Sequence, residues 1–131
     1  MKYMIIGGVA GGASTAARLR RLDEQAEIIL FEKGEYISYA NCGLPYYIGG
    51  VIEERERLFV QTPESFKARF NIEVRIKSEV KAIEPENKQV VIKDWATGKT
   101  YRESFDKLVL SPGAEPVLPP WEGIRTEGIF T

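Results

Sequence analysis

The feature that most constrains the fold lies at the amino terminus, where a short apolar run is followed at once by glycines. Lys2 to Ile6 have the composition of a buried strand, and the sequence Gly7-Gly8-Val9-Ala10-Gly11-Gly12 comes next. Residues 13–22 are rich in Ala, Leu and Arg, which favour helix. Residues 27–32, EIILFE, form a second apolar run that ends in an acid. This order predicts a βαβ unit with a parallel pair of strands.

The glycine cluster indicates a dinucleotide site. Such a fold needs glycine where the chain turns tightly from strand to helix, where the backbone approaches a pyrophosphate, and where the helix packs on the strand. Gly7 and Gly12 supply the first and third of these positions, whereas Val9 occupies the second. Glu32 follows Gly12 by twenty residues and ends the second strand, where an acid accepts the ribose hydroxyls of an adenosine. The alternative is a glycine turn that only packs and a solvated Glu32.

The middle of the chain changes periodicity. Residues 63–69 are predicted to form a helix, with Thr62 as its N-cap and proline at its first position. Residues 72–83 and 89–105 then alternate apolar and polar side chains, and residues 96–99 form a turn. This pattern predicts a small antiparallel meander. A meander inserted after the second strand–helix unit is typical of flavoproteins with two dinucleotide-binding domains, so FAD is favoured over NAD.

The end of the chain combines one more strand with a proline-rich stretch. Residues 108–110 are an apolar run that leads into the turn Ser111-Pro112-Gly113. Residues 116–131 contain three prolines and two glycines and show no clean periodicity, which indicates a connector. At 131 residues the chain is long enough for one domain and too short for two ordinary ones.

Composition excludes several classes of protein. The chain has 18 basic and 19 acidic residues, so neither nucleic acid nor an anionic membrane surface is indicated as a partner. No apolar run approaches the roughly 20 residues of a membrane span, and the amino terminus does not resemble a signal peptide, so a cytoplasmic location is expected. One cysteine and no histidine exclude an internal disulfide and disfavour structural zinc.

The single cysteine lies in the stretch ISYANCGLPYYIGG. Asn41 is a candidate N-cap, Pro45 is tolerated only in a first turn, and Gly49-Gly50 would end a helix, which places Cys42 at a helix start. A helix N-terminus stabilises a thiolate, and a nearby flavin would add to this, so no histidine is needed as a base. The alternative for a lone cysteine is a small buried hydrophobe.

Three stretches together resemble the pyridine nucleotide-disulfide oxidoreductase family: IIGGVAGGASTAARLRRLD, FEKGEYISYANCGLPYYIGG and DKLVLSPGAEP. More narrowly, they resemble its single-cysteine branch, which contains coenzyme A-disulfide reductases and NADH-dependent persulfide or polysulfide reductases. Dithiol members carry Cys-x4-Cys, whereas Tyr47 stands at the second position here. The resemblance therefore implies that Cys42 pairs with a CoA thiol, with a persulfide sulfur, or with oxygen in a sulfenic acid.

The resemblance implies an incomplete Rossmann-like FAD/NAD(P)-binding domain of the α/β class. Members are several times longer, so residues 1–115 are expected to be the N-terminal part of the FAD-binding domain. Residues 116–131 would lead toward an NAD(P)H-binding domain absent from this sequence. A homodimer is expected for the longer protein, and the isolated chain is expected to self-associate through surface that is normally covered.

The implied activity is reduction of CoA disulfide, or of CoA persulfide or polysulfide, by NAD(P)H through FAD and Cys42. The alternatives are an NADH oxidase or peroxidase that uses a cysteine sulfenic acid and, for the isolated chain, a cofactor-binding module without turnover. The resemblance implies further FAD contacts besides the glycine turn and Glu32. These are Lys33, Asn41, Val80, Ser111, Pro112 and Gly113. Expected CoA contacts are Arg18, Arg21, Ser38 and Asn41. The alternative for the helix arginines, Arg20 included, is a solvated outer face.

Overall fold

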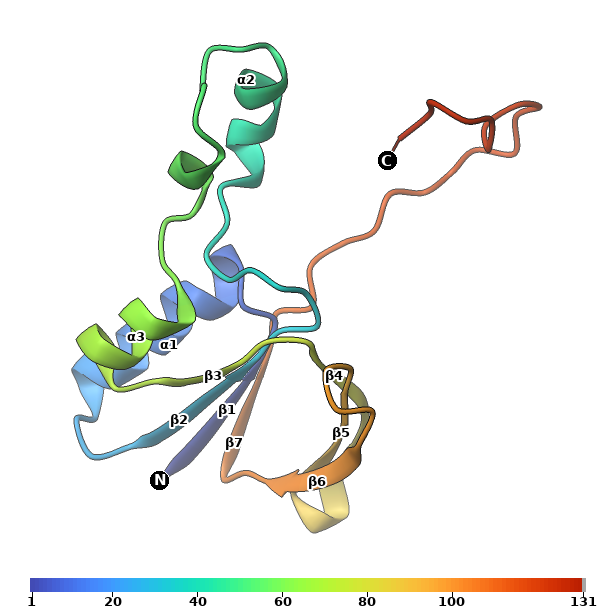
Figure 1. Cartoon of the computed structure of the whole chain (residues 1–131). Coiled ribbons are helices and arrows are strands. Elements are labelled where there is room, and N and C mark those ends of the chain that lie inside the picture. The colour runs from blue at the N-terminus through green and yellow to red at the C-terminus, as the bar shows by residue number, and fades with distance from the viewer. Residues whose placement is uncertain (131) are drawn as a thin grey trace.

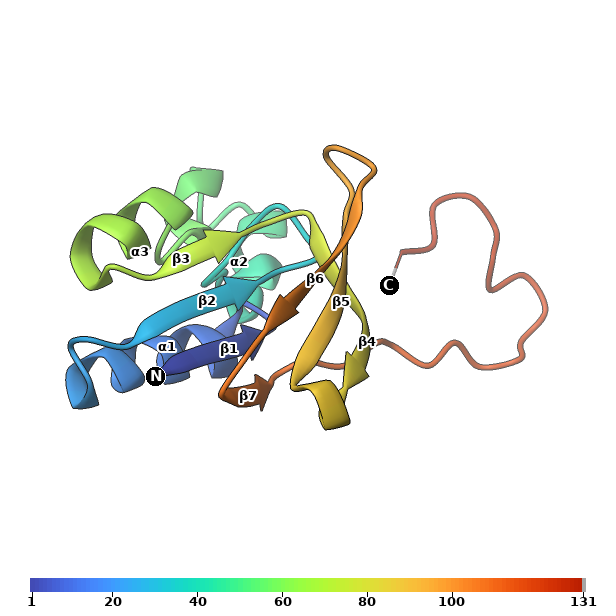
Figure 2. The ribbon, with the colours of Figure 1, turned by 90° about the horizontal axis from the view of Figure 1, so that it is seen from below.

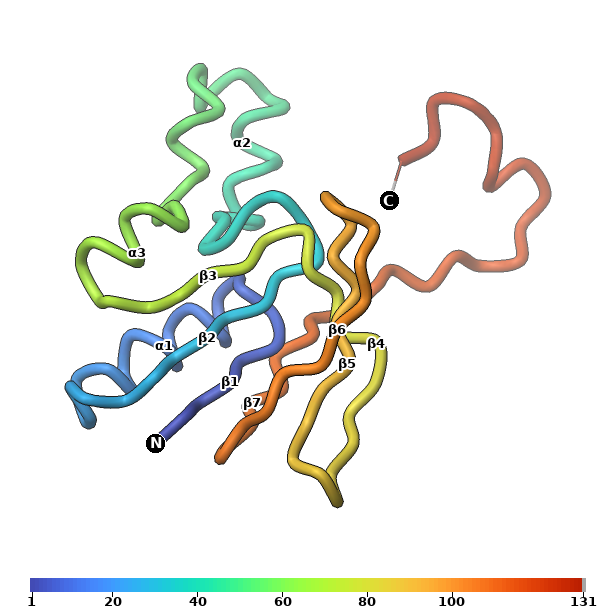
Figure 3. Tube along the Cα trace, turned by 60° about the horizontal axis from the view of Figure 1, so that its bottom comes forward, coloured from blue at the N-terminus to red at the C-terminus, as the bar shows by residue number. Residues whose placement is uncertain are grey.

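The computed structural model describes residues 1–130, and its centre is a parallel sheet of four strands. In the order β3-β2-β1-β7, these strands are Glu73–Arg75, Glu27–Phe31, Lys2–Ile6 and Lys107–Leu110. Figure 3 shows β7 beside β1 on the side away from β2. The arrangement confirms the predicted Rossmann-like α/β class, with two parallel strands joined through a helix at its start.

Two helices cover one face of this parallel sheet and a second sheet covers the other, whereas the helix at Leu44–Ile48 stands away from it (Figure 1, Figure 2). The helices α1, α2 and α3 span Ala10–Leu22, Leu44–Ile48 and Pro63–Phe70, with short 3-10 turns at Asn41–Gly43, Arg55–Leu58 and Pro85–Asn87. The antiparallel sheet contains β4, β5 and β6, at Ser78–Glu84, Gln89–Asp94 and Thr100–Ser104. Thr62 caps α3 as predicted, because its side chain accepts the N–H of Ser65.

Successive side chains of the central strands point to opposite faces of the parallel sheet, and this explains why the sheet has a core layer on each face. Ile5, Ile28 and Leu30 are buried with residues of α1 and α3. The intervening side chains point to the other face, where Met4, Ile29 and Phe31 are buried against Val90 and Ile92 of β5. Because both faces of the sheet are covered, β2 is a continuous apolar run instead of an alternating one.

The prediction that residues 72–83 belong entirely to the antiparallel meander is wrong. Residues 73–75 form β3, which pairs in parallel with β2. Lys77 has a φ of +51° and turns the chain before β4 begins in the other sheet. The alternation of side chains is the same in either sheet, and the crossover through α3 returns the chain parallel to β2.

The first helix begins three residues earlier than the predicted start at Ala13, inside the glycine cluster. Gly11 and Gly12 therefore form part of its first turn. A Cβ at Gly12 would lie 1.7 Å from the carbonyl oxygen of Gly7, so only glycine permits this packing of helix on turn. The second strand likewise ends at Phe31, one residue before the predicted Glu32.

The alternative of a solvated outer face does not hold for Arg20, which is partly buried. Its guanidinium donates to the carbonyl oxygens of Phe70 at 2.8 Å and Asn71 at 2.9 Å, and to those of Asp23 at 3.2 Å and Glu24 at 2.6 Å. These bonds tie the end of α1 to the end of α3, and they give the carbonyl of Phe70, in the last turn of α3, a donor that the helix itself does not supply.

Charged side chains join the two sheets. Glu103 of β6 binds Lys2 at 2.6 Å and Arg75 at 2.7 Å, and Lys2 also lies 3.1 Å from Glu27. Although burial favours the neutral acid, hydrogen bonds from Lys2 and Arg75 lower the pKa of Glu103. Burial opposes the charge of Lys2 as well, but the carboxylates of Glu103 and Glu27 raise its pKa.

Residues 116–130 form neither helix nor strand and lead away from both sheets (Figure 1). The absence of regular structure agrees with the proline-rich pattern, whereas the domain division at residue 115 stays a prediction. Of the helices within residues 1–130, none has the length and apolar composition that crossing a membrane requires.

Candidate functional site

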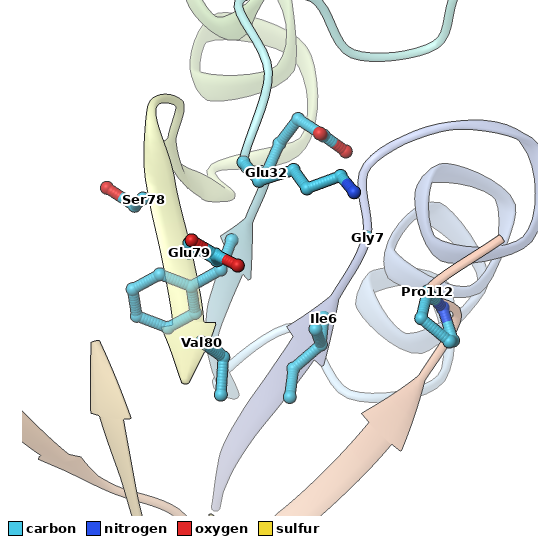
Figure 4. A pocket seen from close by; sticks show the side chains of 9 residues that line it. Ile6, Gly7, Glu32, Ser78, Glu79, Val80 and Pro112 are labelled. Carbon is cyan, nitrogen blue, oxygen red and sulfur yellow. The ribbon is translucent and has the colours of Figure 1, made fainter. Parts of the chain in front are cut away.

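Two adjoining cavities lie at the carboxyl ends of the parallel strands, the edge at which α/β sheets bind ligands. One, of about 350 Å³, surrounds the start of α1, and the other, of about 200 Å³, lies between the end of β2 and β4. They share Gly7, Glu32, Lys33 and Pro112. In Figure 4, Glu32 and Glu79 lie across the smaller cavity from Pro112.

The turn after β1 requires glycine. Gly7 has a φ of +96°, and a Cβ there would lie 1.9 Å from the carbonyl oxygen of Ser111. Its N–H donates to the carbonyl of Phe31 at 2.8 Å, which holds the turn against β2. The strand, the turn and the loop after β7 are thus packed backbone against backbone.

The start of α1 is suited to an anion. Val9 occupies the N-cap position, no side chain within the described residues caps the helix, and its first turn contains no acid. The first N–H groups of a helix have no intrahelical acceptor and carry partial positive charge. Val9, Ala10 and Gly11 line the larger cavity, so this end of the helix faces the space that a phosphate would occupy.

Glu32 lies at the junction of both cavities and braces the turn. Its Oε2 accepts the N–H of Gly8 at 2.8 Å, and its Oε1 accepts the N–H of Gly34, also at 2.8 Å. Gly8 itself is buried, and a Cβ there would lie 2.7 Å from the side chain of Ile37. Each carboxylate oxygen keeps a further lone pair for a ligand hydroxyl.

Most of the predicted FAD contacts line these cavities: Gly7, Val9, Ala10, Gly11, Glu32, Lys33, Asn41, Val80, Ser111, Pro112 and Gly113. Gly8 and Gly12 are buried within the turn instead. Ser78, Glu79 and Ala114 line the cavities without having been predicted. Alternation places 78 and 79 in a strand, but only the tertiary structure brings that strand beside the glycine turn.

The cysteine segment differs from its prediction at the helix start. Asn41 is not an N-cap: it lies inside the 3-10 turn, which Ala40 precedes without a side-chain cap. Pro45 lies in the first turn of α2, and the helix ends at Gly49-Gly50, as predicted. The side chain of Cys42 is exposed, so the interpretation of a buried hydrophobe is wrong. Its neighbour Asn41 lines the larger cavity.

Backbone hydrogen bonds attach this segment to the glycine turn. The N–H of Ser38 donates to the carbonyl of Gly8 at 2.8 Å, and Val60 donates to the carbonyl of Ser38 at 3.0 Å. Ala40 donates to Leu58 at 2.8 Å in the same loop pair. Ser38 adopts a φ of +49°, a conformation that few residues other than glycine take. The turn and the thiol-bearing loop therefore form one hydrogen-bonded unit.

The predicted CoA contacts divide into two groups. Ser38 and Asn41 lie at the glycine turn and the larger cavity, as described above. Arg18 and Arg21 are exposed on α1 and line neither of the two cavities. The structure thus gives the two arginines no contact with the glycine-turn site.

Two lysines contribute positive charge around the cavities. Lys33 lies 3.3 Å from Glu115, and Lys81 lies 3.2 Å from Glu79. Hydrogen bonds from Lys81 and from the Trp95 indole, and then the charge of Lys33, lower the pKa of Glu79. The cavities therefore contain charges of both signs, and the carboxylate of Glu79 already has partners.

Comparison with known proteins gives consistent matches. The family model described as pyridine nucleotide-disulphide oxidoreductase matches residues 1–131. A coenzyme A disulfide reductase of Staphylococcus epidermidis is 48% identical over 113 residues, which are 86% of this chain and 26% of that protein. This chain thus spans about a quarter of the length of the curated relatives it matches.

Two solved structures are similar as well. Reduced CoADR-RHD of Bacillus anthracis has a TM-score of 0.91 and 59% identity, covering 94% of this chain and 22% of that one. An NAD-dependent persulfide reductase from A. fulgidus has a TM-score of 0.92 and 39% identity, covering 98% of this chain and 24% of that one.

Proposed function

Because this chain belongs to the pyridine nucleotide-disulphide oxidoreductase family, we propose that it is the FAD-binding, cysteine-bearing part of an NAD(P)H-dependent reductase. Its substrates would be CoA disulfide or a CoA persulfide or polysulfide. The observation that carries the proposal is the cavity of about 350 Å³, which joins the start of α1 to Asn41, the residue next to Cys42.

The residues present fit FAD. Gly7 and Gly12 let the turn and the helix pack backbone against backbone, and this packing places the start of α1 at the larger cavity. The pyrophosphate would bind this helix start, and Glu32 would accept the ribose hydroxyls. Val80, Lys33 and the turn at 111–113 would contact the rest of the cofactor. When bound, FAD supplies hydride acceptance from NAD(P)H and electron transfer to sulfur.

Cys42 would act as the nucleophile toward the substrate. Its thiolate attacks one sulfur of CoA disulfide, so that a Cys42–CoA disulfide forms and one CoA thiolate leaves. The exposed side chain is open to such a substrate. The position of a second thiol is taken by Tyr47, so within this segment the pairing sulfur has to come from the substrate.

The rest of the proposal concerns CoA and the remainder of the protein. CoA would be contacted by Ser38, Asn41, Arg18 and Arg21. The two arginines line neither cavity, so they would bind the CoA phosphates on the outer surface of α1. Residues 1–115 would be the N-terminal part of the FAD-binding domain, and residues 116–131 the connector. NAD(P)H binding and homodimerisation would belong to a longer protein, because this chain spans about a quarter of its curated relatives.

A second candidate applies to the isolated chain. It would bind the cofactor without turnover, which the short span relative to the curated relatives supports. The exposure of Cys42 also supports the oxidase or peroxidase alternative, because an accessible thiolate can be oxidised to a sulfenic acid.

The test has two levels. The purified chain is titrated with FAD and followed by flavin fluorescence, with Gly7→Ala compared against Gly98→Ala, a change at a positive-φ glycine in open space. We expect FAD binding by the wild type and by Gly98→Ala, and loss of binding in a folded Gly7→Ala chain. Absence of FAD binding by the wild type would contradict the cofactor assignment.

At the second level, steady-state rates with CoA disulfide, CoA persulfide and oxygen are compared in the full-length protein and its Cys42→Ser variant. The proposal expects the two CoA substrates to lose turnover in Cys42→Ser. If oxygen is the best acceptor and Cys42→Ser leaves reduction of the CoA substrates unaffected, the oxidase alternative is favoured.

A further inference from the structure

Lys33 and Glu115 form an ion pair beside the larger cavity. Lys33 follows Glu32 at the end of β2 and lines both cavities, whereas Glu115 follows the turn at 111–113. Lys33 Nζ lies 3.3 Å from Glu115 Oε1. Since Gly113 and Ala114 line the larger cavity, the pair joins its two walls.

Because the pair is exposed, Lys33 can exchange Glu115 for another anion at little cost in free energy. The side chain of Lys33 is 61% exposed and that of Glu115 is 85% exposed. Exposed pairs contribute little to stability, because water screens both charges and the side chains lose freedom. A ligand pyrophosphate at the start of α1 would offer Lys33 a second counter-ion with two negative charges.

We propose that Glu115 is an affinity-determining residue, a carboxylate that competes with the phosphates of a bound dinucleotide for Lys33. In the ligand-free chain Lys33 pairs with Glu115, and on binding it turns to the phosphate. Glu115 thereby weakens binding of phosphorylated ligands and leaves unphosphorylated ones unaffected. This inference rests on the proposed function, because it takes the cavity to be a dinucleotide site.

The test is a double-mutant cycle on the 131-residue chain, with ADP and adenosine as probes in isothermal titration calorimetry. The variants are Glu115→Gln, Lys33→Met and their combination. Glu122→Gln is the matched control, since it removes the same charge from the same exposed segment. We expect Glu115→Gln to bind ADP about two- to fivefold more tightly at low salt, the range of an exposed pair.

Three further results are expected. The gain in ADP affinity caused by Glu115→Gln disappears in the Lys33→Met background. The same gain is smaller at high ionic strength, because salt screens exposed charges. Adenosine binds all variants with equal affinity. Equal ADP affinity of Glu115→Gln and Glu122→Gln, or a gain that persists in Lys33→Met, would overturn the inference alone. Failure of ADP to bind the wild-type chain would instead contradict the proposed dinucleotide site.

Discussion

The carboxylate of Glu32 accepts the backbone N–H of Gly8 at 2.8 Å, and this bond joins the end of β2 to the turn after β1. The acid predicted to bind a ribose therefore also braces the turn on which the phosphates would lie. Because Gly8 in turn accepts the N–H of Ser38, the bracing extends to the loop that carries Cys42.

This bracing predicts that Glu32 matters for folding as well as for binding. Glu32→Ala leaves the N–H groups of Gly8 and Gly34 without their acceptor, and we expect it to lower the free energy of unfolding by about 1–3 kcal/mol. Urea denaturation measures this, with the exposed Glu86→Ala as control. Equal stability of the two variants would show that the bonds to Glu32 do not brace the turn.

Gly7 differs from Gly98, another positive-φ glycine, in what surrounds it. Gly7→Ala brings a Cβ to 1.9 Å from a carbonyl oxygen, whereas at Gly98, with a φ of +74°, no atom lies within 4 Å. Gly98→Ala should cost only the conformational strain of about 1–2 kcal/mol. Gly7→Ala should cost clearly more, as measured by thermal and urea unfolding. Similar losses in both variants would mean that the turn relaxes to admit a side chain.

The ion cluster between the sheets predicts an acid dependence of stability. Because the pKa of Glu103 is lowered in the folded chain, its contribution is present above the unfolded value of 4.5 and is lost as the pH falls through the folded value. Glu103→Gln should therefore flatten the decline of unfolding free energy below that pH. The comparison is urea unfolding across the acid range, with Glu86→Gln as control; parallel curves for wild type and Glu103→Gln would refute the assignment.

Arg20 and Arg21 are adjacent in sequence but have different surroundings. Arg20 donates to four carbonyl oxygens, so Arg20→Ala should destabilise the chain by about 1–3 kcal/mol. The exposed Arg21 should tolerate alanine within about 0.5 kcal/mol. The urea unfolding midpoints of the two variants test this difference in stability, and equal midpoints would show that the bonds of Arg20 to the four carbonyls do not stabilise the fold.

Exposed apolar side chains predict self-association of the isolated chain. Ile48 is 81% exposed and Val51 is 75% exposed on and after α2, and strand β7 pairs only with β1 among the described residues. Such surface and such sheet edges favour contacts between copies. Analytical ultracentrifugation should show concentration-dependent oligomers, reduced in Ile48→Glu with Val51→Glu. A wild-type chain that stays monomeric at high concentration would disprove this prediction.

Local pattern was enough to predict much of the fold and part of the site. The glycine cluster between two apolar runs predicted the parallel unit, and proline after Thr62 predicted the start of α3, because these depend on neighbours in the chain. Arg20 could not be separated from Arg18 and Arg21 in this way. All three lie on one helix, and only the packing of α3 decides which guanidinium meets carbonyls.

The sequence by itself determined the strand–turn–helix unit, the acid at the end of β2 and the single thiol near a helix start, since each follows from backbone preferences within a few residues. The tertiary structure decided the sheet to which residues 73–75 belong, the placement of β4 beside the glycine turn, and the bond of Glu32 to Gly8. These depend on which segments distant in sequence become neighbours, and alternation of side chains is the same for either sheet.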